Sequence, residues 1–441
     1  MTSSLTTAPA RPQSLRQTLR DFGRPPRIVG LDIARGIAVI GMIAAHTLET
    51  SAMFVWSDPE TWTALANGRP SILFALLAGI SIALMTGRTQ VPERSQLGSI
   101  RLRLVARGVM IFAIGLVLEL LGTNIAIILT FYGIVYVVAM LFVGLRVRTL
   151  VIWAAALAVA GPALQAGLVS VSPFGFGEGT TLMLHGTYSI FVWTSLMLAG
   201  LALGRLELTR AKVAAGALAI GVAMSSIGYS VGVLWGPGEE AGWSSSVSSA
   251  SSSASSSAYA APVTPGDEVD LSGLFCEDYG DGFVSCYPPE FFDEMPEDEP
   301  IESQQRLGGS WDDYIDMVQA NAPLDMMSDA LLASSPHSGG TMELFGSGGL
   351  ALALVGLLLL VGRGLRHALL PIAAVGSMPL TAYTTHVVVI WIVGGPGGWI
   401  DDPAFFWWLT GAVLVGCTAW ALLVGRGPLE RLTAYVSRRV G

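Results

Sequence analysis

Four ionisable side chains, Asp32, Arg35, His46 and Glu49, accompany the first long apolar segment of the chain. An α-helix turns about 100° per residue, so Arg35 and His46 share one face and lie about 16 Å apart along the axis. Asp32 and Glu49 each lie three residues from one of them, a spacing at which helical side chains pair. Arg35 could hold a phosphate or carbonyl, and His46 is a natural general base, whose tautomer Glu49 would fix. The alternative is a structural Asp32–Arg35 pair and a histidine that only packs helices.

Five further polar residues lie in or beside later apolar segments. His386 is expected at a depth similar to the first imidazole, with Tyr383 one turn before it. Arg69 opens the second segment and could meet an anionic acceptor or Glu49. Glu119 and Tyr132 are further candidates for binding substrate. Ionisable groups in membrane segments are expensive and often functional, but hydrogen bonding between helices is an equally valid explanation for Tyr383 and His386.

Other kinds of site leave little trace in the sequence. We find no metal-ligand spacing, no Gly-rich phosphate loop and no nucleophile motif built on Ser or Cys. We therefore predict no metal.

The composition indicates what must position these residues. Hydrophobic residues make up 52% of the 441 and charged residues only 13%, against roughly 25% charged in soluble domains. A spanning helix needs about 20 apolar residues. Such runs occur at roughly 34–54, 70–87, 104–121, 124–144, 149–168, 189–204, 213–235, 346–362, 369–394 and 404–424. We predict an all-α, polytopic membrane helix bundle of about ten transmembrane helices.

The distribution of arginine orients this bundle, because basic residues accumulate in cytoplasmic loops. With ten spans, the basic N-terminal tail, the basic C-terminal tail and every Arg-rich connection fall on one side. We expect a plasma-membrane protein with both termini in the cytoplasm and an uncleaved first helix. The arginines are scattered at segment ends, which argues against a nucleic-acid partner.

One segment carries almost all of the acidic charge. Residues 236–345 hold 21 acidic residues and one basic residue, whereas the rest of the chain has a net charge of +11. We predict a long, mostly disordered, acidic extracytoplasmic loop, rich in Ser at its start. Cys276 and Cys286 lie within it on the oxidising side, so a disulfide is expected, with two free thiols as the alternative. We expect deletion of about 240–335 to leave activity largely intact.

The predicted organisation has five parts. They are a cytoplasmic Arg-rich tail (1–28), transmembrane helices 1–7 (29–235), the acidic loop (236–345), helices 8–10 (346–425) and a basic cytoplasmic tail (426–441).

The first helix has a pattern known from one superfamily. Leu31-Asp32-x-x-Arg35-Gly36-Ile37-Ala38, with His46 following, resembles the opening helix of the transmembrane acyltransferases. These include heparan-α-glucosaminide N-acetyltransferase and the bacterial membrane O-acetylases. The stretches Gly68–Ser81, Ser377–Tyr383 and Gly427–Glu430 resemble a bacterial YeiB-like branch. The resemblance covers essentially all ten spans and omits the acidic loop.

The resemblance implies transfer of an acyl group from cytosolic acetyl-CoA or another acyl-CoA to an envelope glycan or glycolipid. By position, His46 matches the essential histidine of the O-acetylases, and Asp32 and Arg35 match the motif expected at the donor. The heparan enzyme has its catalytic histidine in the following luminal loop, but loop 55–68 has none here. His46 is therefore expected to act either as a base for direct transfer or as an acyl carrier.

Two other functions compete with this enzyme. The chain could transport or export a small metabolite or lipid, for which Pro371, Pro379 and the loop Gly394–Gly398 resemble helix breaks. It could also be a membrane scaffold whose acidic loop recruits partners, although a scaffold has no need of the intramembrane histidine and arginine. The expected partners are the bilayer, the acyl donor and the acceptor; a homodimer is left open.

Overall fold

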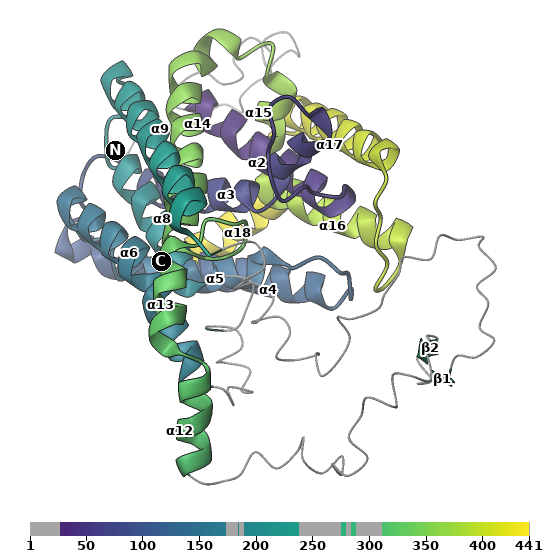
Figure 1. The fold of residues 1–441 in the computed structure, drawn as a ribbon. Coiled ribbons are helices and arrows are strands. Elements are labelled where there is room, and N and C mark those ends of the chain that lie inside the picture. The colour runs from purple at the N-terminus through teal and green to yellow at the C-terminus, as the bar shows by residue number, and fades with distance from the viewer. Residues whose placement is uncertain are drawn as a thin grey trace, which may run out of the picture. The chain divides into compact units, whose positions relative to one another are not determined.

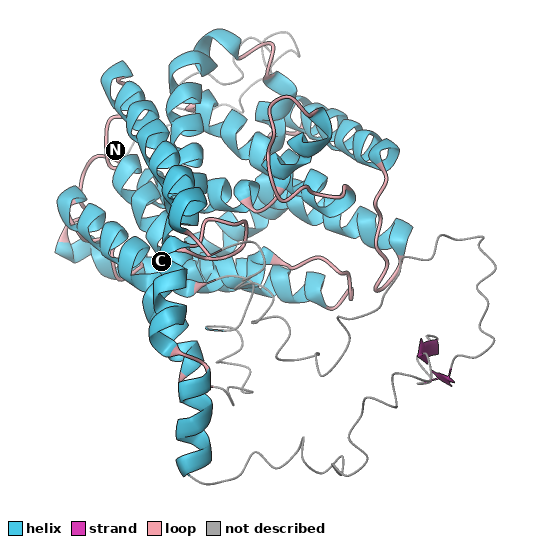
Figure 2. Ribbon diagram, in the orientation of Figure 1, coloured by secondary structure: helices cyan, strands magenta, loops and turns pink. Residues whose placement is uncertain are grey.

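Apolar runs become helices through most of the chain that the structure describes (Figure 1). The structure is a computed structural model, and it describes residues 27–172, 184, 189–237, 275–278, 284–287 and 311–440. The chain divides into two units, Met1–Val247 with Pro323–Gly441, and Ser248–Ala322. Figure 2 shows the helices together with the single strand pair of the described ranges.

The first unit contains the helical body. Its helices are α2 (Val29–Thr47), the 3₁₀ helix η1 (Pro59–Ala66), α3 (Arg69–Met85), α4 (Arg94–Glu119), α5 (Ile128–Ala139), α6 (Val147–Ser170), α8 (Ile190–Gly204), α9 (Ala211–Trp235), α13 (Pro323–Leu332), α14 (Thr341–Leu365), α15 (Leu370–Ser377), α16 (Pro379–Gly394), α17 (Pro403–Leu423) and α18 (Pro428–Val440).

All ten predicted apolar runs overlap helices, but they differ in length and charge. Within the described residues, six helical segments are long and apolar enough to cross a membrane: α2, η1 with α3, α6, α9, α14 and α17. Helices α5 and α8 have only 12 and 15 residues, and the first half of α4 is rich in arginine. The protein therefore has the helices of a multi-pass membrane protein, while the number ten stays a prediction.

The ninth predicted run is a bent pair of helices. Helices α15 and α16 meet at 91° across a short break. Met378 at the break is not helical, with φ −138° and ψ 57°, because Pro379 disfavours a helical conformation in the residue before it. Counted as one span, the pair would raise the number of crossing segments to seven.

Helix α2 lies within the core, and α15 packs against it at the level of Asp32. Gly376 of α15 faces the carbonyl oxygen of Asp32 and the backbone nitrogen of Gly36, and a side chain at this position would collide with both. Close helix approach through small residues is typical of membrane proteins. Helix α14 packs along α9, and α3 along α8 (Figure 1).

The second unit has a β-hairpin and a helix. Strands β1 (Phe275–Asp278) and β2 (Val284–Tyr287) are antiparallel, and their register places Cys276 opposite Cys286. The side chains of these strands lie outside the described residues, so the disulfide stays a prediction. Helix α12 (Trp311–Ala320) completes the described part of this unit.

The predicted disorder of the acidic loop is wrong for its last part. Residues 311–345 include α12, α13 and the start of α14, which begins at Thr341 and not near 346. Apolar residues recur at helical spacing there, and Ala330 of α13 is 2% exposed. Most of the earlier part of the loop, including its Ser-rich tract, lies outside the described residues, as does the N-terminal tail up to residue 26.

Candidate active site

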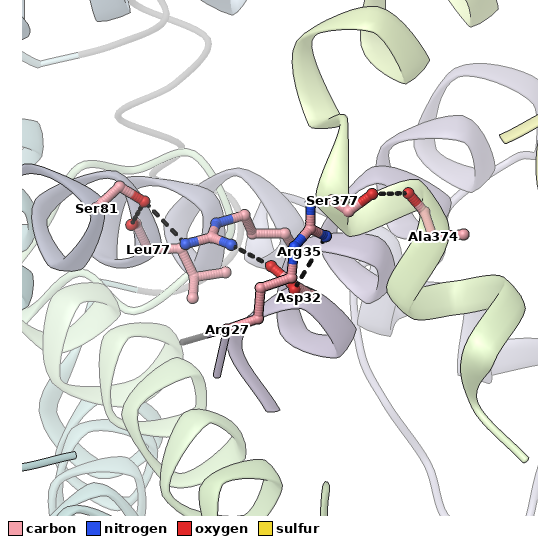
Figure 3. Close-up of polar contacts among 7 residues, drawn as sticks. All are labelled: Arg27, Asp32, Arg35, Leu77, Ser81, Ala374 and Ser377. Carbon is pink, nitrogen blue, oxygen red and sulfur yellow. Dashed lines mark hydrogen bonds and ion pairs between the residues drawn. The ribbon is translucent and has the colours of Figure 1, made fainter. Parts of the chain in front are cut away.

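Asp32 and Arg35 form an ion pair on the first turns of α2 (Figure 3). Arg35 Nη1 donates to Asp32 Oδ1 at 2.8 Å, and Arg35 Nη2 donates to Ser81 Oγ on α3 at 3.0 Å. Asp32 Oδ2 also lies 3.8 Å from Nη1 of Arg27. One carboxylate thus holds two guanidinium groups, and Ser81 fixes the direction of Arg35.

Arg35 lines a cavity of about 400 Å³, which we call the Arg35 cavity. Its other lining residues are Phe74, Leu77, Ala78, Ser81, Met85, Arg107, Ile111, Leu129, Tyr132, Tyr136, Gly376, Ser377, Pro379, Leu380, Arg426 and Glu430. Arg107 lies over the Tyr136 ring at 5.9 Å. The lining includes three guanidinium groups, those of Arg35, Arg107 and Arg426, and one carboxylate, that of Glu430. The cavity therefore suits an anionic or strongly polar ligand.

His46 and His386 are in direct contact at the other end of α2. Nδ1 of His46 lies 3.1 Å from Nε2 of His386, and the two rings are stacked, with centroids 5.3 Å apart and planes at 11°. His386 is fully buried, and the Tyr383 ring meets it edge-on at 4.9 Å. A hydrogen bond between these nitrogens needs one proton between them, so one imidazole donates and the other accepts.

A second cavity, of about 270 Å³, opens beside this pair, and we call it the His46 cavity. It is lined by Met42, Ala45, His46, Thr50, Ala66, Asn67, Gly68, Pro70, Ser71, Asn124, Ile125, Ala126, Ile128, His337, Tyr383 and Trp399. Its residues come from segments throughout the first unit. His46 lines this cavity, whereas His386 contacts His46 without being part of the lining.

His337 is a further imidazole of this cavity. It precedes α14 in a left-handed conformation, φ 63°, and its backbone N–H donates to Glu343 Oε1 at 2.9 Å. Its ring lies beside Gly68, where φ is 71° and a Cβ would come within 3.4 Å of Nε2. Burial lowers the pKa of His337 below 6.5. The only sequence signal was a short turn, Pro336-His337-Ser338-Gly339, between two helices.

The two cavities lie end to end. Ser71 lines the His46 cavity and Phe74, one turn further along α3, lines the Arg35 cavity; the neighbours Ile128 and Leu129 are divided in the same way. The Tyr132 hydroxyl donates to the carbonyl of Ser71 at 3.3 Å, and its ring contacts Phe74 at 5.4 Å between centroids. A thin layer of side chains therefore separates the arginine end from the histidine end.

Three predicted site residues lie elsewhere. Helix α2 ends at Thr47, and Glu49 is exposed with its N–H donating to Asp401 Oδ1 at 2.8 Å. It therefore does not share the helical face assumed for it, and Nδ1 of His46 contacts His386. Glu119 is exposed and accepts from Thr130 Oγ1 at 2.8 Å.

Arg69 is held between neighbouring elements. Its Nε donates to the Tyr229 hydroxyl at 2.9 Å, its Nη1 donates to the Ala64 carbonyl, and its guanidinium lies 5.5 Å from the centre of the Tyr229 ring. These contacts differ from the expected contact with Glu49. Arg69 is absent from the lining of the His46 cavity, although Gly68 and Pro70 on either side of it take part.

The C-terminal helix completes the Arg35 cavity. Glu430 of α18 accepts from the N–H groups of Leu380 and Thr381 at 2.8 and 3.1 Å and from the Thr381 hydroxyl at 2.5 Å. It therefore caps α16, whose own N-cap, Met378, provides no side-chain hydrogen bond. Across the described ranges no group of three His, Cys, Asp or Glu side chains is placed to hold a metal ion.

Helices of membrane-spanning length and a histidine pair at the edge of one cavity define a multi-pass membrane protein with a candidate catalytic centre. The family model of the heparan-α-glucosaminide N-acetyltransferase catalytic domain matches residues 27–228. This match supports the family suggested by the first-helix motif, and with it an acetyltransferase. No curated protein and no solved structure matches the chain.

Proposed function

We propose that the protein is an integral membrane acyltransferase that moves an acyl group, foremost acetyl, from cytosolic acyl-CoA to a cell-envelope glycan or lipid-linked saccharide. The observation that carries the proposal is the contact of His46 with His386 at 3.1 Å, at the edge of a cavity that lies end to end with an arginine-lined one. The family match over residues 27–228 supports the reaction class.

The arginine distribution orients the two cavities. Arg35 lies near the basic N-terminal end of α2, so the Arg35 cavity faces the cytoplasm if basic residues are inside. Acyl-CoA would enter there, with Arg35, Arg107 and Arg426 holding its polar groups. The acceptor would enter the His46 cavity from the outer face of the plasma membrane.

The transfer requires one proton to move. The acceptor hydroxyl or amine attacks the thioester carbon, a new C–O or C–N bond forms, and the C–S bond breaks. In direct transfer, His46 Nε2 takes the acceptor proton and the proton ends on the CoA sulfur. In the other route, Nε2 of His46 attacks the thioester first, the C–S bond breaks and the CoA thiolate leaves. The acceptor then attacks the acyl-imidazole, the bond to Nε2 breaks, and the acceptor proton ends on the CoA sulfur. In both routes His386, bound to Nδ1, holds the ring and exchanges the shared proton.

We place His337 on the acceptor side of the reaction. It lines the same cavity as His46 but comes from the loop before α14. With its pKa lowered, its neutral imidazole at pH 7 can donate or accept a hydrogen bond to a sugar hydroxyl.

The test uses purified full-length protein in neutral detergent with radiolabelled acetyl-CoA. Removing a general base costs about 10²–10⁴-fold in rate, so we expect His46→Gln and His386→Gln to lose acetyl-CoA turnover to that extent. His367→Gln, an exposed histidine outside both cavities, is the matched control. Acetyl label retained on the wild-type protein and lost in His46→Gln would select the acyl-carrier route.

A transporter is the second candidate, because the 91° break between α15 and α16 resembles the discontinuous helices of transporters. Wild-type protein that neither binds nor turns over acetyl-CoA would exclude the enzyme. Uptake of a solute into proteoliposomes, unchanged in His46→Gln, would then favour the transporter.

A further inference from the structure

A third cavity, of about 470 Å³, concentrates arginine outside the site described above, and we call it the basic pocket. It is lined by Arg27, Ile28, Val29, Gly30, Arg88, Leu208, Thr209, Arg210, Ala211, Ala214, Leu359, Leu360, Arg363 and Arg366. Its five arginines come from four places: before α2, after α3, at the start of α9 and at the end of α14. None of its lining residues carries a carboxylate.

Two acids lie beside these arginines. Asp32 lies 3.8 Å from Arg27, and Glu207 accepts from Arg210 Nη2 at 3.0 Å. Five guanidinium groups around one cavity, with no carboxylate in its lining, concentrate positive charge there. Like charges held around one cavity repel one another, and an anion in the cavity relieves that repulsion. The planar fork of arginine donors matches phosphate oxygens in particular.

The start of α9 adds to the attraction for an anion. Its N-cap, Arg210, makes no side-chain capping hydrogen bond, and Ala211 and Ala214 of its first turn line the pocket. The N-terminal end of a helix carries a partial positive charge and free N–H donors.

Apolar residues also line the pocket, namely Ile28, Val29, Leu359 and Leu360. Helix α14 is long and apolar enough to cross a membrane, and it exposes Leu357, Leu360 and Val361 by 42%, 38% and 37%. An apolar strip therefore leads away from the arginines along a membrane-length helix, which fits a ligand that joins a phosphate to hydrocarbon chains.

We propose that the basic pocket binds the phosphate of an anionic phospholipid, with its acyl chains along the exposed face of α14. Basic pockets between transmembrane helices are suited to such headgroups. The proposal is independent of the acyl-transfer reaction. Through Asp32, which holds Arg27 and Arg35 together, the bound lipid would also be coupled to the Arg35 cavity (Figure 3).

The test measures lipid binding to the full-length protein in neutral detergent. Thermal unfolding is followed while phosphatidylglycerol or phosphatidylcholine is added. We expect phosphatidylglycerol to raise the Tm saturably and phosphatidylcholine to leave it unchanged. Each charge-assisted contact is worth about tenfold in affinity, so Arg363→Gln/Arg366→Gln should need at least about tenfold more phosphatidylglycerol for the same shift.

Arg438→Gln/Arg439→Gln is the matched control, because it removes the same charge from the last turn of α18, outside the pocket. Arg210→Gln provides an independent variant if the double variant does not fold. Equal shifts with both lipids, or equal loss in pocket and control variants, would overturn the proposal. A different result would also overturn it: no Tm shift with phosphatidylglycerol, but a shift with inorganic phosphate or adenosine 3′,5′-bisphosphate that is absent in Arg363→Gln/Arg366→Gln. The pocket would then bind a soluble phosphate.

Discussion

Burial explains why the imidazoles of this protein are suited to proton transfer and not to carrying fixed charge. His386 has no exposed surface, and its Nε2 lies against Nδ1 of His46. Two imidazolium rings cannot share this contact, since each would present a proton to the other. A neutral pair can instead pass one proton across 3.1 Å as the acceptor reacts.

His337 leads to a prediction about pH. Because its pKa is lowered in the folded state, the unfolded protein binds a proton below about pH 6.5 that the folded protein does not. Its contribution to stability is therefore complete above pH 6.5 and is lost as the pH falls toward the lowered pKa. We expect His337→Asn, which tolerates the left-handed backbone, to weaken the fall in Tm between pH 7 and pH 5. An unchanged pH profile of Tm would contradict this.

The same variant separates binding from chemistry. If His337 contacts the acceptor, His337→Asn should raise the acceptor KM up to about tenfold, the cost of about one lost hydrogen bond. Hydrolysis of acetyl-CoA without acceptor should stay at the wild-type level. His367→Asn, in an exposed position, serves as control.

At the scale of elements, α16 depends on a cap from far along the chain. Glu430 lies 50 residues after Leu380 and binds the first free N–H groups of α16. We expect Glu430→Ala to cost about 1–3 kcal/mol, because it leaves buried donors without a partner. Turnover should also fall, since α16 carries His386.

Thermal unfolding and acetyl-CoA turnover measured together would check this. Glu207→Ala is the control, since Glu207 forms only an exposed pair with Arg210, and such pairs are worth about 0–1 kcal/mol. A Tm unchanged in Glu430→Ala would show that the cap is dispensable.

The helices themselves could be predicted, and so could a similar depth for His46 and His386, but their contact could not. Apolar runs are long enough to be recognised, and the two histidines follow from their depth in predicted spans. Glu49 was misplaced because the helix ends at Thr47, where Leu48 turns extended. His337 was missed because its place depends on a turn and on contacts with Gly68 and Glu343, which no sequence periodicity records.

At the scale of the whole molecule, the acidic segment divides into a part outside the described fold and a part that belongs to it. Helix α13 packs on α6, and the carbonyl of Ala333 accepts the N–H of Glu343 at 3.0 Å. His337, four residues after Ala333, lines the His46 cavity. The region that the sequence suggested was removable, about 240–335, includes α13, so we expect its removal to disturb this packing.

A pair of deletions tests this boundary. Removing 240–310 should leave acetyl-CoA turnover within about twofold of wild type, because it spares α13 and His337. Removing 240–335 should abolish turnover and lower the Tm, because it exposes the surface of α6 that α13 covers. Turnover and Tm of both deletions, measured side by side, decide the matter; equal activity would contradict the role given to α13.

The contact between His46 and His386 joins residues 340 positions apart in the chain. During synthesis the first histidine is inserted long before its partner leaves the ribosome. A chain made only as far as α9 therefore holds Arg35 and Arg107 but lacks both Arg426 and the second histidine of the pair. If the protein acts as proposed, a truncated or stalled product would occupy the membrane without consuming acyl-CoA.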